Sequence, residues 1–422
     1  MAELVSTLDI YNVIRKTLGC MDKEVLQHGE ITAYIFYNML LAEGGYTNVE
    51  LAEYTLIGML HDVGIIKTGF SSKNGVGDYE TNNVWAHSVY GYLFLKYLSP
   101  VEDKADIILY HHLPYYLHSR IKSKHLKVTQ YLTLADKMDV FMRMSGHGME
   151  QDYFTTQADI KFSAKALELF HLAQAKFQFL EKLKTNEYAK ELQDLFEGAS
   201  LSEKVKKGFL EMLVYAIDFR SQQTVIHTMS TKTFAVELGR LLRVPTMDLQ
   251  ALYYGALLHD IGKVAIPVSI LEAPRRLNDD EMRIMKAHVV ISDKILRGAL
   301  DDKIVEIAAR HHEKLDGTGY PRGIQGEELT QLERIIAVAD ILSALYGKRS
   351  YKDSFPPEKI KGILQGDADS GKICPKVVQV AIGSFDKIIQ NYEKERDVTM
   401  ERYMEIVNQY ESIYERFKSF ET

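Results

Sequence analysis

A series of histidines and aspartates occurs twice along this chain, in one order and about 200 residues apart. The first series is His28, His61, Asp62, His87, His111, His112 and Asp136, and the second is His227, His259, Asp260, His288, His311, His312 and Asp340. The flanking residues repeat as well, since LHDVG at 60–64 corresponds to LHDIG at 258–262. Ten of the 14 histidines belong to the two series, an order that scattered core histidines would not adopt. The chain is therefore predicted to hold two copies of one domain.

Apolar residues recur at every third or fourth position along nearly the whole chain, and prolines are few (9). This spacing is typical of amphipathic helices, whereas the alternation of strands is rare here. We therefore expect an all-α protein, with a loop at 74–83. Helices are expected at 32–41, 51–60, 105–110, 128–142 and 249–258, and single long helices at 162–183 and 216–242.

The two series divide the chain into four predicted parts. Residues 1–150 and 201–395 are each expected to form a helical bundle around one series. Residues 151–200 lack the histidine pattern and are predicted to form a helical connector that packs on a neighbour. Residues 396–422, with Tyr403, Tyr410 and Tyr414 at helical spacing, are expected to form a C-terminal helix. It would lie on its own domain or make a dimer contact.

The composition excludes several classes of protein. The net charge of −7 is unsuited to holding a DNA or RNA backbone. Two cysteines far apart, Cys20 and Cys374, argue against a disulfide framework and fit a reducing compartment. No apolar run reaches the ~18 residues that a membrane span needs, and the N-terminus has no secretory signal pattern. We expect a soluble, cytoplasmic protein without nucleic-acid or membrane partners.

The chemistry of the repeated residues points to metal ions. Imidazole nitrogens and carboxylate oxygens without thiolates suit Fe, Mn or Zn. An adjacent pair such as His259 and Asp260 allows the aspartate to bridge two ions while the histidine binds one. Two ions about 3.5–4 Å apart can bind a phosphoryl oxygen and lower the pKa of a bridging water. A single His-Asp pair would be explained more simply as a helix cap. Five such features in the same order, found twice along the chain, favour metal centres.

The second half resembles the HD-GYP phosphodiesterases, a family within the HD superfamily of metal-dependent phosphohydrolases. The resemblance covers roughly 201–392 and rests on HDIGK at 259–263, HHEKLDGTGYPRG at 311–323 and KRSYK at 348–352. It implies two tandem HD-type bundles, the second of which hydrolyses a cyclic dinucleotide. By position it implies metal ligands at His227, His259, Asp260, His288, His311, His312 and Asp340.

The resemblance also implies the residues that handle the substrate. Asp260 and Lys263 would be catalytic, with Lys263 at the scissile phosphate. Tyr320 and Pro321 would shape the substrate pocket. Arg349 and Lys352 would bind phosphate, although without the resemblance these two would be assigned to a solvated turn.

Each half departs from the family pattern in its own way. Gln223 stands where members with three metals have a glutamate, so two ions are predicted in the C-terminal domain, Fe or Mn rather than Zn. The first half has Ile65 at the position of Lys263 and no Gly-Tyr-Pro loop after His112. A second metal site is nevertheless expected there, formed by Glu24, His28, His61, Asp62, His87, His111, His112 and Asp136. Its role would be regulatory or scaffolding, with an independent phosphohydrolase as the rival.

The predicted function is hydrolysis of a cyclic dinucleotide messenger of bacterial signalling through a metal-bridging hydroxide, giving the linear dinucleotide, GMP or both. Cyclic di-GMP is the substrate that the resemblance favours. One alternative is an HD phosphohydrolase for cyclic GMP-AMP or another nucleotide. The other is a receptor that binds the dinucleotide without cleaving it. The sequence leaves a homodimer open.

Overall fold

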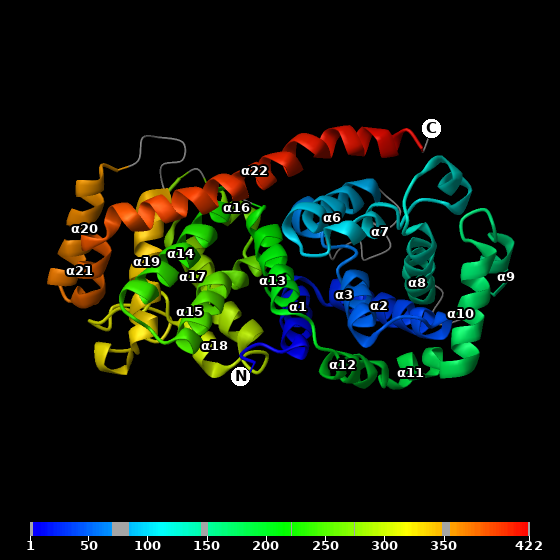
Figure 1. Ribbon diagram of the computed structural model, residues 1–422, viewed down its shortest axis with the longest axis horizontal. Coiled ribbons are helices and arrows are strands. Elements are labelled where there is room, and N and C mark those ends of the chain that lie inside the picture. The colour runs from blue at the N-terminus through cyan, green and yellow to red at the C-terminus, as the bar shows by residue number, and fades with distance from the viewer. Residues whose placement is uncertain are drawn as a thin grey trace. The chain divides into compact units, whose positions relative to one another are not determined.

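The computed structural model describes residues 3–69, 84–144, 151–220, 222–273, 275–347 and 355–420 (Figure 1). Within these ranges the regular elements are helices, and extended backbone is limited to isolated bridges, so the prediction of an all-α protein is confirmed. The expected loop at 74–83 and the residues Arg349 and Lys352 lie outside the described ranges. None of the described helices has the length and hydrophobicity that crossing a bilayer requires.

The chain divides into two compact units. The N-terminal unit contains Ser6–Met212 together with Tyr403–Thr422, and the C-terminal unit contains Leu213–Arg402 together with Met1–Val5. Two helices, α13 (Glu203–Asp218) and α22 (Phe385–Lys418), have residues in both units.

In the N-terminal unit, the central helix is α2 (Lys23–Glu43). It packs on α3 (Asn48–Met59) and α8 (Leu126–Met144), while α6 (Val84–Leu98) packs on α7 (Asp106–Leu109). The other short elements of this part are α1 (Thr7–Met21), α4 (Ile65–Thr68), η1 (Glu102–Lys104), η2 (Tyr115–Arg120) and α9 (Gln151–Thr156).

The C-terminal unit repeats this arrangement with its own helices. Here α14 (Gln222–Leu241) packs on α15 (Thr246–Leu258) and α19 (Gln331–Gly347), while α17 (Asp279–Leu296) packs on α18 (Asp302–Ala309). The repeated histidines and aspartates therefore lie on corresponding helices of the two units, or directly after them. The remaining elements are η3 (Ile261–Ala265), α16 (Val268–Leu271), η4 (Gly326–Glu328), α20 (Pro357–Asp369) and α21 (Pro375–Gly383).

Capping residues explain where one helix of each unit begins. Thr47 forms a capping box with Glu50 at the start of α3, and Asn278 forms one with Glu281 at the start of α17. Such a box satisfies backbone N–H groups that the first turn of a helix leaves without partners. The capping box thereby stabilises the start of α17, the helix that carries His288.

The expected single helix at 162–183 is wrong. The structure has α10 (Ala164–Phe177) and α11 (Phe179–Thr185), separated by Gln178 in the left-handed region with φ 51°. Glutamine gives no sequence signal for that conformation, unlike glycine. The connector does pack on a neighbour, since α10 lies on α2 and α8, and α12 (Tyr188–Gly198) lies on α1.

The expected single helix at 216–242 is also wrong, because α13 ends at Asp218 and α14 begins at Gln222. Neither proline nor glycine marks this break. Arg220 lies in it and donates hydrogen bonds to the backbone carbonyls of Lys263 (3.2 Å), Val264 (2.7 Å) and Ile266 (3.1 Å). These tertiary contacts stabilise the interruption of the helix, which helical periodicity cannot predict.

The C-terminal helix starts earlier than expected and packs elsewhere. Helix α22 begins at Phe385, and its last part belongs to the N-terminal unit. There Phe417 lies 4.9 Å, between ring centroids, from Trp85, and Tyr410 stacks on Tyr90 at 4.0 Å. The apolar spacing indicated a buried face, but it carried no information about which bundle would cover that face.

Candidate metal centres

In the C-terminal unit, separate segments bring the predicted ligands together. His227 comes from α14, His288 from α17 and Asp340 from α19. The pair His259 and Asp260 follows α15, and the pair His311 and His312 follows α18. The structure thus assembles every predicted C-terminal ligand in one cluster.

Asp260 is the centre of this cluster, and its two oxygens face different histidines. Oδ1 lies 3.1 Å from Nε2 of His288 and 4.0 Å from Nε2 of His311. Oδ2 lies 3.2 Å from Nε2 of His259 and 3.4 Å from Nε2 of His227. The carboxylate therefore divides the histidines into two groups, as a ligand shared between two ions would.

Asp340 closes the cluster from α19. Its Oδ1 lies 3.1 Å from Nε2 of His227, and its Oδ2 lies 3.4 Å from Nδ1 of His312. Each of its oxygens thus faces a different imidazole. A second carboxylate in this position can complete the ligand sets that Asp260 begins.

Backbone carbonyls fix the orientation of the imidazole rings. Nδ1 donates to a carbonyl three residues earlier in three pairs: His259 to Ala256 (2.8 Å), His288 to Met285 (2.6 Å) and His311 to Ala308 (2.6 Å). Because a carbonyl only accepts, the proton is on Nδ1 and the lone pair of Nε2 faces the cluster. His227 is held instead by Ser343, whose Oγ lies 2.9 Å from Nδ1.

The buried atoms that lack partners fit a metal centre. Within the described residues, four ligand atoms of the cluster have no hydrogen-bond partner: Oδ1 of Asp260, Nε2 of His288, Nε2 of His311 and Oδ1 of Asp340. Leaving such atoms buried without a partner costs roughly 1–3 kcal/mol each. Divalent ions would satisfy all four, and the nitrogen and oxygen donors suit first-row metals.

A close backbone contact places Asp260 beside His288. A Cβ atom on Gly262 would lie 2.1 Å from the carbonyl oxygen of His288, so only glycine allows η3 to approach α17 here. Ser292 secures the contact, since its Oγ accepts from the N–H of Gly262 (2.9 Å) and donates to the carbonyl of His259 (2.8 Å). Gly64 makes the equivalent approach to His87, at 2.0 Å.

Lys263 occupies the edge of the cluster. Its ammonium forms an ion pair with Asp260, and the backbone around it is held by Arg220. Burial lowers the pKa of Lys263, but Asp260, together with Asp218 and Asp340, raises it above its ordinary value, so the side chain remains a cation. A fixed cation beside a two-sided carboxylate is well placed to meet a phosphate oxygen.

The Gly-Tyr-Pro loop lies against His312. The buried carboxylate of Glu313 accepts from the backbone N–H groups of Arg322 (2.7 Å) and Ile324 (3.2 Å), which fixes the loop. The ring of Tyr320 consequently lies 4.7 Å from the ring of His312, between centroids. Pro321 is exposed at the same loop. Tyr320 therefore borders the cluster, whereas nothing in the described residues places Arg349 or Lys352.

Electrostatics set the protonation of the cluster. Burial would raise the pKa of Asp260, but His259 and Lys263 lower it well below its usual range. Burial likewise opposes the charge on His227, yet Asp260 and Asp340 raise its pKa to about 9. Burial lowers the pKa of His312 to about 4. The cluster thus presents ionised carboxylates, with a proton on His227 that a metal would displace.

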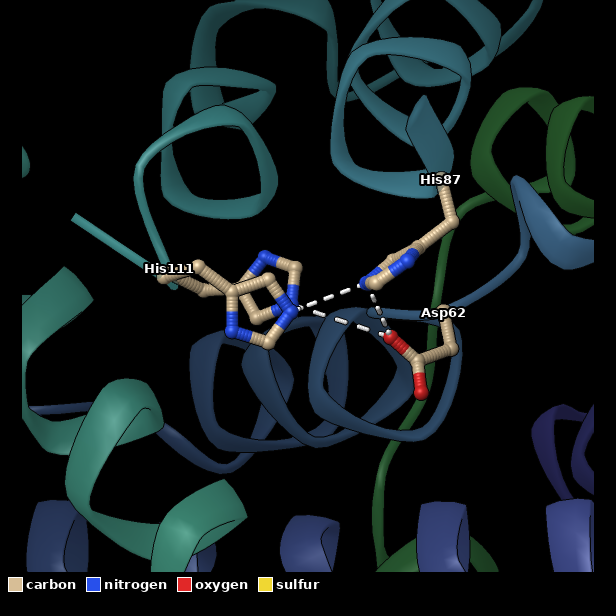
Figure 2. A group of neighbouring side chains, drawn as sticks. Asp62, His87 and His111 are labelled. Carbon is tan, nitrogen blue, oxygen red and sulfur yellow. Dashed lines mark hydrogen bonds and ion pairs between the residues drawn. The ribbon is translucent and has the colours of Figure 1, made fainter. Parts of the chain in front are cut away.

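The N-terminal unit contains a second cluster of the same kind (Figure 2). Oδ1 of Asp62 lies 3.2 Å from Nε2 of His87 and 3.7 Å from Nε2 of His111. Oδ2 of Asp62 lies 3.4 Å from Nε2 of His61 and 3.5 Å from Nε2 of His28. Figure 2 shows Asp62, His87 and His111 directed toward one another.

The remaining predicted residues of this cluster behave unequally. Asp136 lies 3.4 Å from Nε2 of His28 and 3.7 Å from Nδ1 of His112. Glu24 is exposed in the first turn of α2 and belongs to none of the ligand groups among the described residues. Ile65 is buried where the other cluster has a lysine. This cluster can accept metal, and its described cation is Lys137, which lies 3.2 Å from Oδ2 of Asp136 instead of at the position of Lys263.

Sequence reasoning missed the residues that support the ligands. Ser343 lies three positions after Asp340 on one helix face, so helical spacing could have indicated it. Ser292 gave no signal, because the first copy has Gly91 at that position. The side chain of Gln223, on which the expected number of metals depended, lies outside the described side chains.

Parts of this chain are similar in sequence to known phosphodiesterases. Residues 211–377 match the family model described as an HD domain. The 3'3'-cGAMP-specific phosphodiesterase 1 of Vibrio cholerae is 26% identical over 412 residues, which covers 90% of each chain. The cyclic di-GMP phosphodiesterase response regulator RpfG of Xanthomonas campestris is 32% identical over 203 residues, or 43% of this chain and 53% of the relative.

One solved structure resembles the whole chain. It is that of a cyclic GMP-AMP specific phosphodiesterase of V. cholerae, with a TM-score of 0.53 and 21% identity. The match covers 90% of this chain and 97% of that one. At this identity the likeness establishes the fold and no more.

Proposed function

This chain belongs to the HD-domain family, and on that premise we propose that its C-terminal unit is a metal-dependent phosphodiesterase for a cyclic dinucleotide. The observation that supports this most is the position of Asp260. Its two oxygens face two separate groups of histidines, 3.1 Å from His288 on one side and 3.2 Å from His259 on the other. A carboxylate shared in this way suits a pair of ions.

The proposed ligands are the C-terminal series, and the proposed mechanism assigns each other residue one task. When bound, paired divalent ions would lower the pKa of a water and stabilise charge on the phosphate. Lys263 would donate to a non-bridging oxygen or to the leaving oxygen, because its ammonium is fixed at the edge of the cluster. Tyr320 would border the sugar or base, because its ring packs beside His312.

The identity of the substrate follows from the similarities only as a proposal. The relative that matches this chain along 90% of both lengths is named for 3'3'-cGAMP, so that nucleotide is the first to test. Cyclic di-GMP is the second, because RpfG is similar over the C-terminal part. Both are guanine-containing cyclic dinucleotides with two phosphates.

A substrate panel tests this function. The full chain, reconstituted separately with Mn²⁺, Fe²⁺ and Zn²⁺, would be incubated with 3'3'-cGAMP, cyclic di-GMP and guanosine tetraphosphate. Chromatography of the products should show a linear dinucleotide from at least one cyclic substrate. Cleavage of guanosine tetraphosphate alone would favour a different HD phosphohydrolase. Binding of a cyclic dinucleotide without turnover under any metal would favour a receptor.

For the N-terminal unit we propose a metal centre without catalytic activity. It has the ligand geometry, but Ile65 replaces the lysine that lies beside the central aspartate of the other unit. Without that cation, the developing charge on a phosphate would lack one electrostatic partner. The unit would therefore bind metal for structure or regulation.

A further inference from the structure

Lys286 lies at the border of the C-terminal centre. It is on α17, two residues before His288, and its side chain is exposed. Its ammonium lies 4.8 Å from the ring centroid of Tyr320, whose ring in turn lies 4.7 Å from that of His312. A chain of contacts thus connects this lysine, through one aromatic ring, to the ligand cluster.

Among the described residues, Lys286 contacts an aromatic ring and no carboxylate. Other cations near the centre are already engaged: Lys263 pairs with Asp260, and Arg310 pairs with Glu306 at 2.5 Å. Lys286 makes no ion pair within the described part of the chain, and its described partner is the face of Tyr320. A cation that is held in place but not neutralised is available for an anionic ligand.

The other copy supports a role in substrate binding. Trp85 occupies the position equivalent to Lys286, two residues before His87. It is buried with 4% exposure and packs on Phe417. The copy with Ile65 in place of Lys263 therefore also has an apolar residue in place of Lys286, while its histidines remain clustered. The N-terminal unit keeps the ligand geometry but has neither lysine, at the position of Lys263 or at that of Lys286.

We propose that Lys286 binds the second, uncleaved phosphate of the cyclic dinucleotide. This inference rests on the proposed function. The scissile phosphate belongs at the ligand cluster and Lys263, so the other phosphate of the ring must lie away from the cluster. Lys286 offers an ammonium 4.8 Å from the ring centroid of Tyr320, and this ring lies between the lysine and the ligand cluster in the chain of contacts. Its charge would contribute to binding rather than to the chemical step.

Binding to metal-loaded full chain tests the proposal. The probe is a phosphorothioate cyclic dinucleotide, which resists cleavage and keeps both charges. Lys286→Gln should weaken its binding about tenfold, as expected for one charge-assisted contact. Lys286→Arg should restore most of the affinity. Lys294→Gln is the matched control, because Lys294 is an exposed lysine on the same helix, and its affinity should stay within about twofold.

A ligand with one phosphate separates this role from a structural one. Guanylyl-guanosine, a linear dinucleoside monophosphate, should bind wild type and Lys286→Gln equally, since it lacks the second phosphate. Equal weakening of both ligands, or weakening of neither, would overturn the proposal. So would the absence of any binding by the wild type. If wild type binds the probe but never cleaves a native cyclic dinucleotide, the proposed function fails while the test of Lys286 still stands.

Discussion

The carboxylate of Asp139 lies 2.7 Å from Nδ1 of His28, at a position on α8 that α19 fills with Ser343. Asp139 also accepts a hydrogen bond from Nε of Arg143 at 2.6 Å. For the equivalent histidine of the C-terminal centre, His227, the described side-chain group beside Nδ1 is the hydroxyl of Ser343. A carboxylate behind an imidazole makes it a more basic ligand, so His28 should bind a metal ion more firmly than His227 would.

Replacing Asp139 by the serine of the other copy tests this relationship. In a chain whose C-terminal centre is disabled by His259→Ala and Asp260→Asn, Asp139→Ser should weaken metal binding roughly 10–100-fold. Metal titration with equilibrium dialysis would measure it. Asp194→Ser changes an exposed aspartate of the same unit and should have no effect. Unchanged metal affinity in the Asp139→Ser variant would show that this carboxylate does not strengthen metal binding.

Metal uptake by the C-terminal centre should depend on pH. Asp260 and Asp340 outweigh the desolvation of His227 and raise its pKa to about 9, so this imidazole is protonated at pH 7 without metal. A metal must displace that proton, and apparent affinity should rise with pH and level off above about 9. Calorimetry in buffers of different ionisation enthalpy would count the proton released. Zero proton release at pH 7 would contradict the prediction. The control is a His227→Ala chain.

Asp218 should make the metal-free C-terminal unit less stable as pH rises. Burial raises its pKa to about 6, from an ordinary value of 3.8, so folding favours the protonated form. The penalty is absent below about pH 3.8, grows between 3.8 and 6, and is complete above 6, where it amounts to roughly 2–3 kcal/mol. Asp218→Asn removes the titration.

The difference in unfolding free energy between wild type and Asp218→Asn should therefore change across that window. Chemical denaturation of chelated protein at several pH values would measure it. An exposed control, Asp369→Asn, should give no such slope. A constant difference between pH 4 and 7 would show that Asp218 keeps an ordinary pKa in the folded state.

Ser292 should matter to the C-terminal centre although it touches no ligand atom directly. Ser292→Ala leaves the N–H of Gly262 and the carbonyl of His259 without their hydrogen bonds, at 2.9 and 2.8 Å. Two buried groups without partners should lower the unfolding free energy by about 1–3 kcal/mol. Metal occupancy should fall with it. The exposed Ser370→Ala is the control, and equal melting of both variants would contradict this role.

The ligand clusters could be predicted because they depend mainly on two features of the sequence, its helical spacing and its internal repeat. Helical spacing fixed the directions of residues such as His227 and Asp340, and the repeat showed which positions belong together. The all-α class followed from the same spacing. A cluster of imidazoles and carboxylates also has few alternative explanations, since so many buried polar groups need partners.

The helix breaks, the packing of α22 and the position of Lys286 could not be predicted from local sequence patterns. The break at Gln178 has a residue in the left-handed region, but the sequence has no glycine there that would indicate it. The break before α14 is stabilised by the hydrogen bonds of Arg220 to the backbone of η3. The end of α22 shows an apolar face whose partner, Trp85, lies far away in sequence. Lys286 was overlooked for the same reason, because its meaning comes from the position of Tyr320.

The central claim is that the C-terminal cluster performs the hydrolysis. It is tested most directly by comparing cyclic dinucleotide turnover in two matched variants of the full chain, His259→Ala and His61→Ala, each with its metal content measured. We predict that His259→Ala lowers turnover at least about a hundredfold, because a pair of ions that would activate water at this centre would lose a ligand. His61→Ala should stay within about threefold of wild type. Loss of turnover in His61→Ala with normal turnover in His259→Ala would contradict the assignment of the two units.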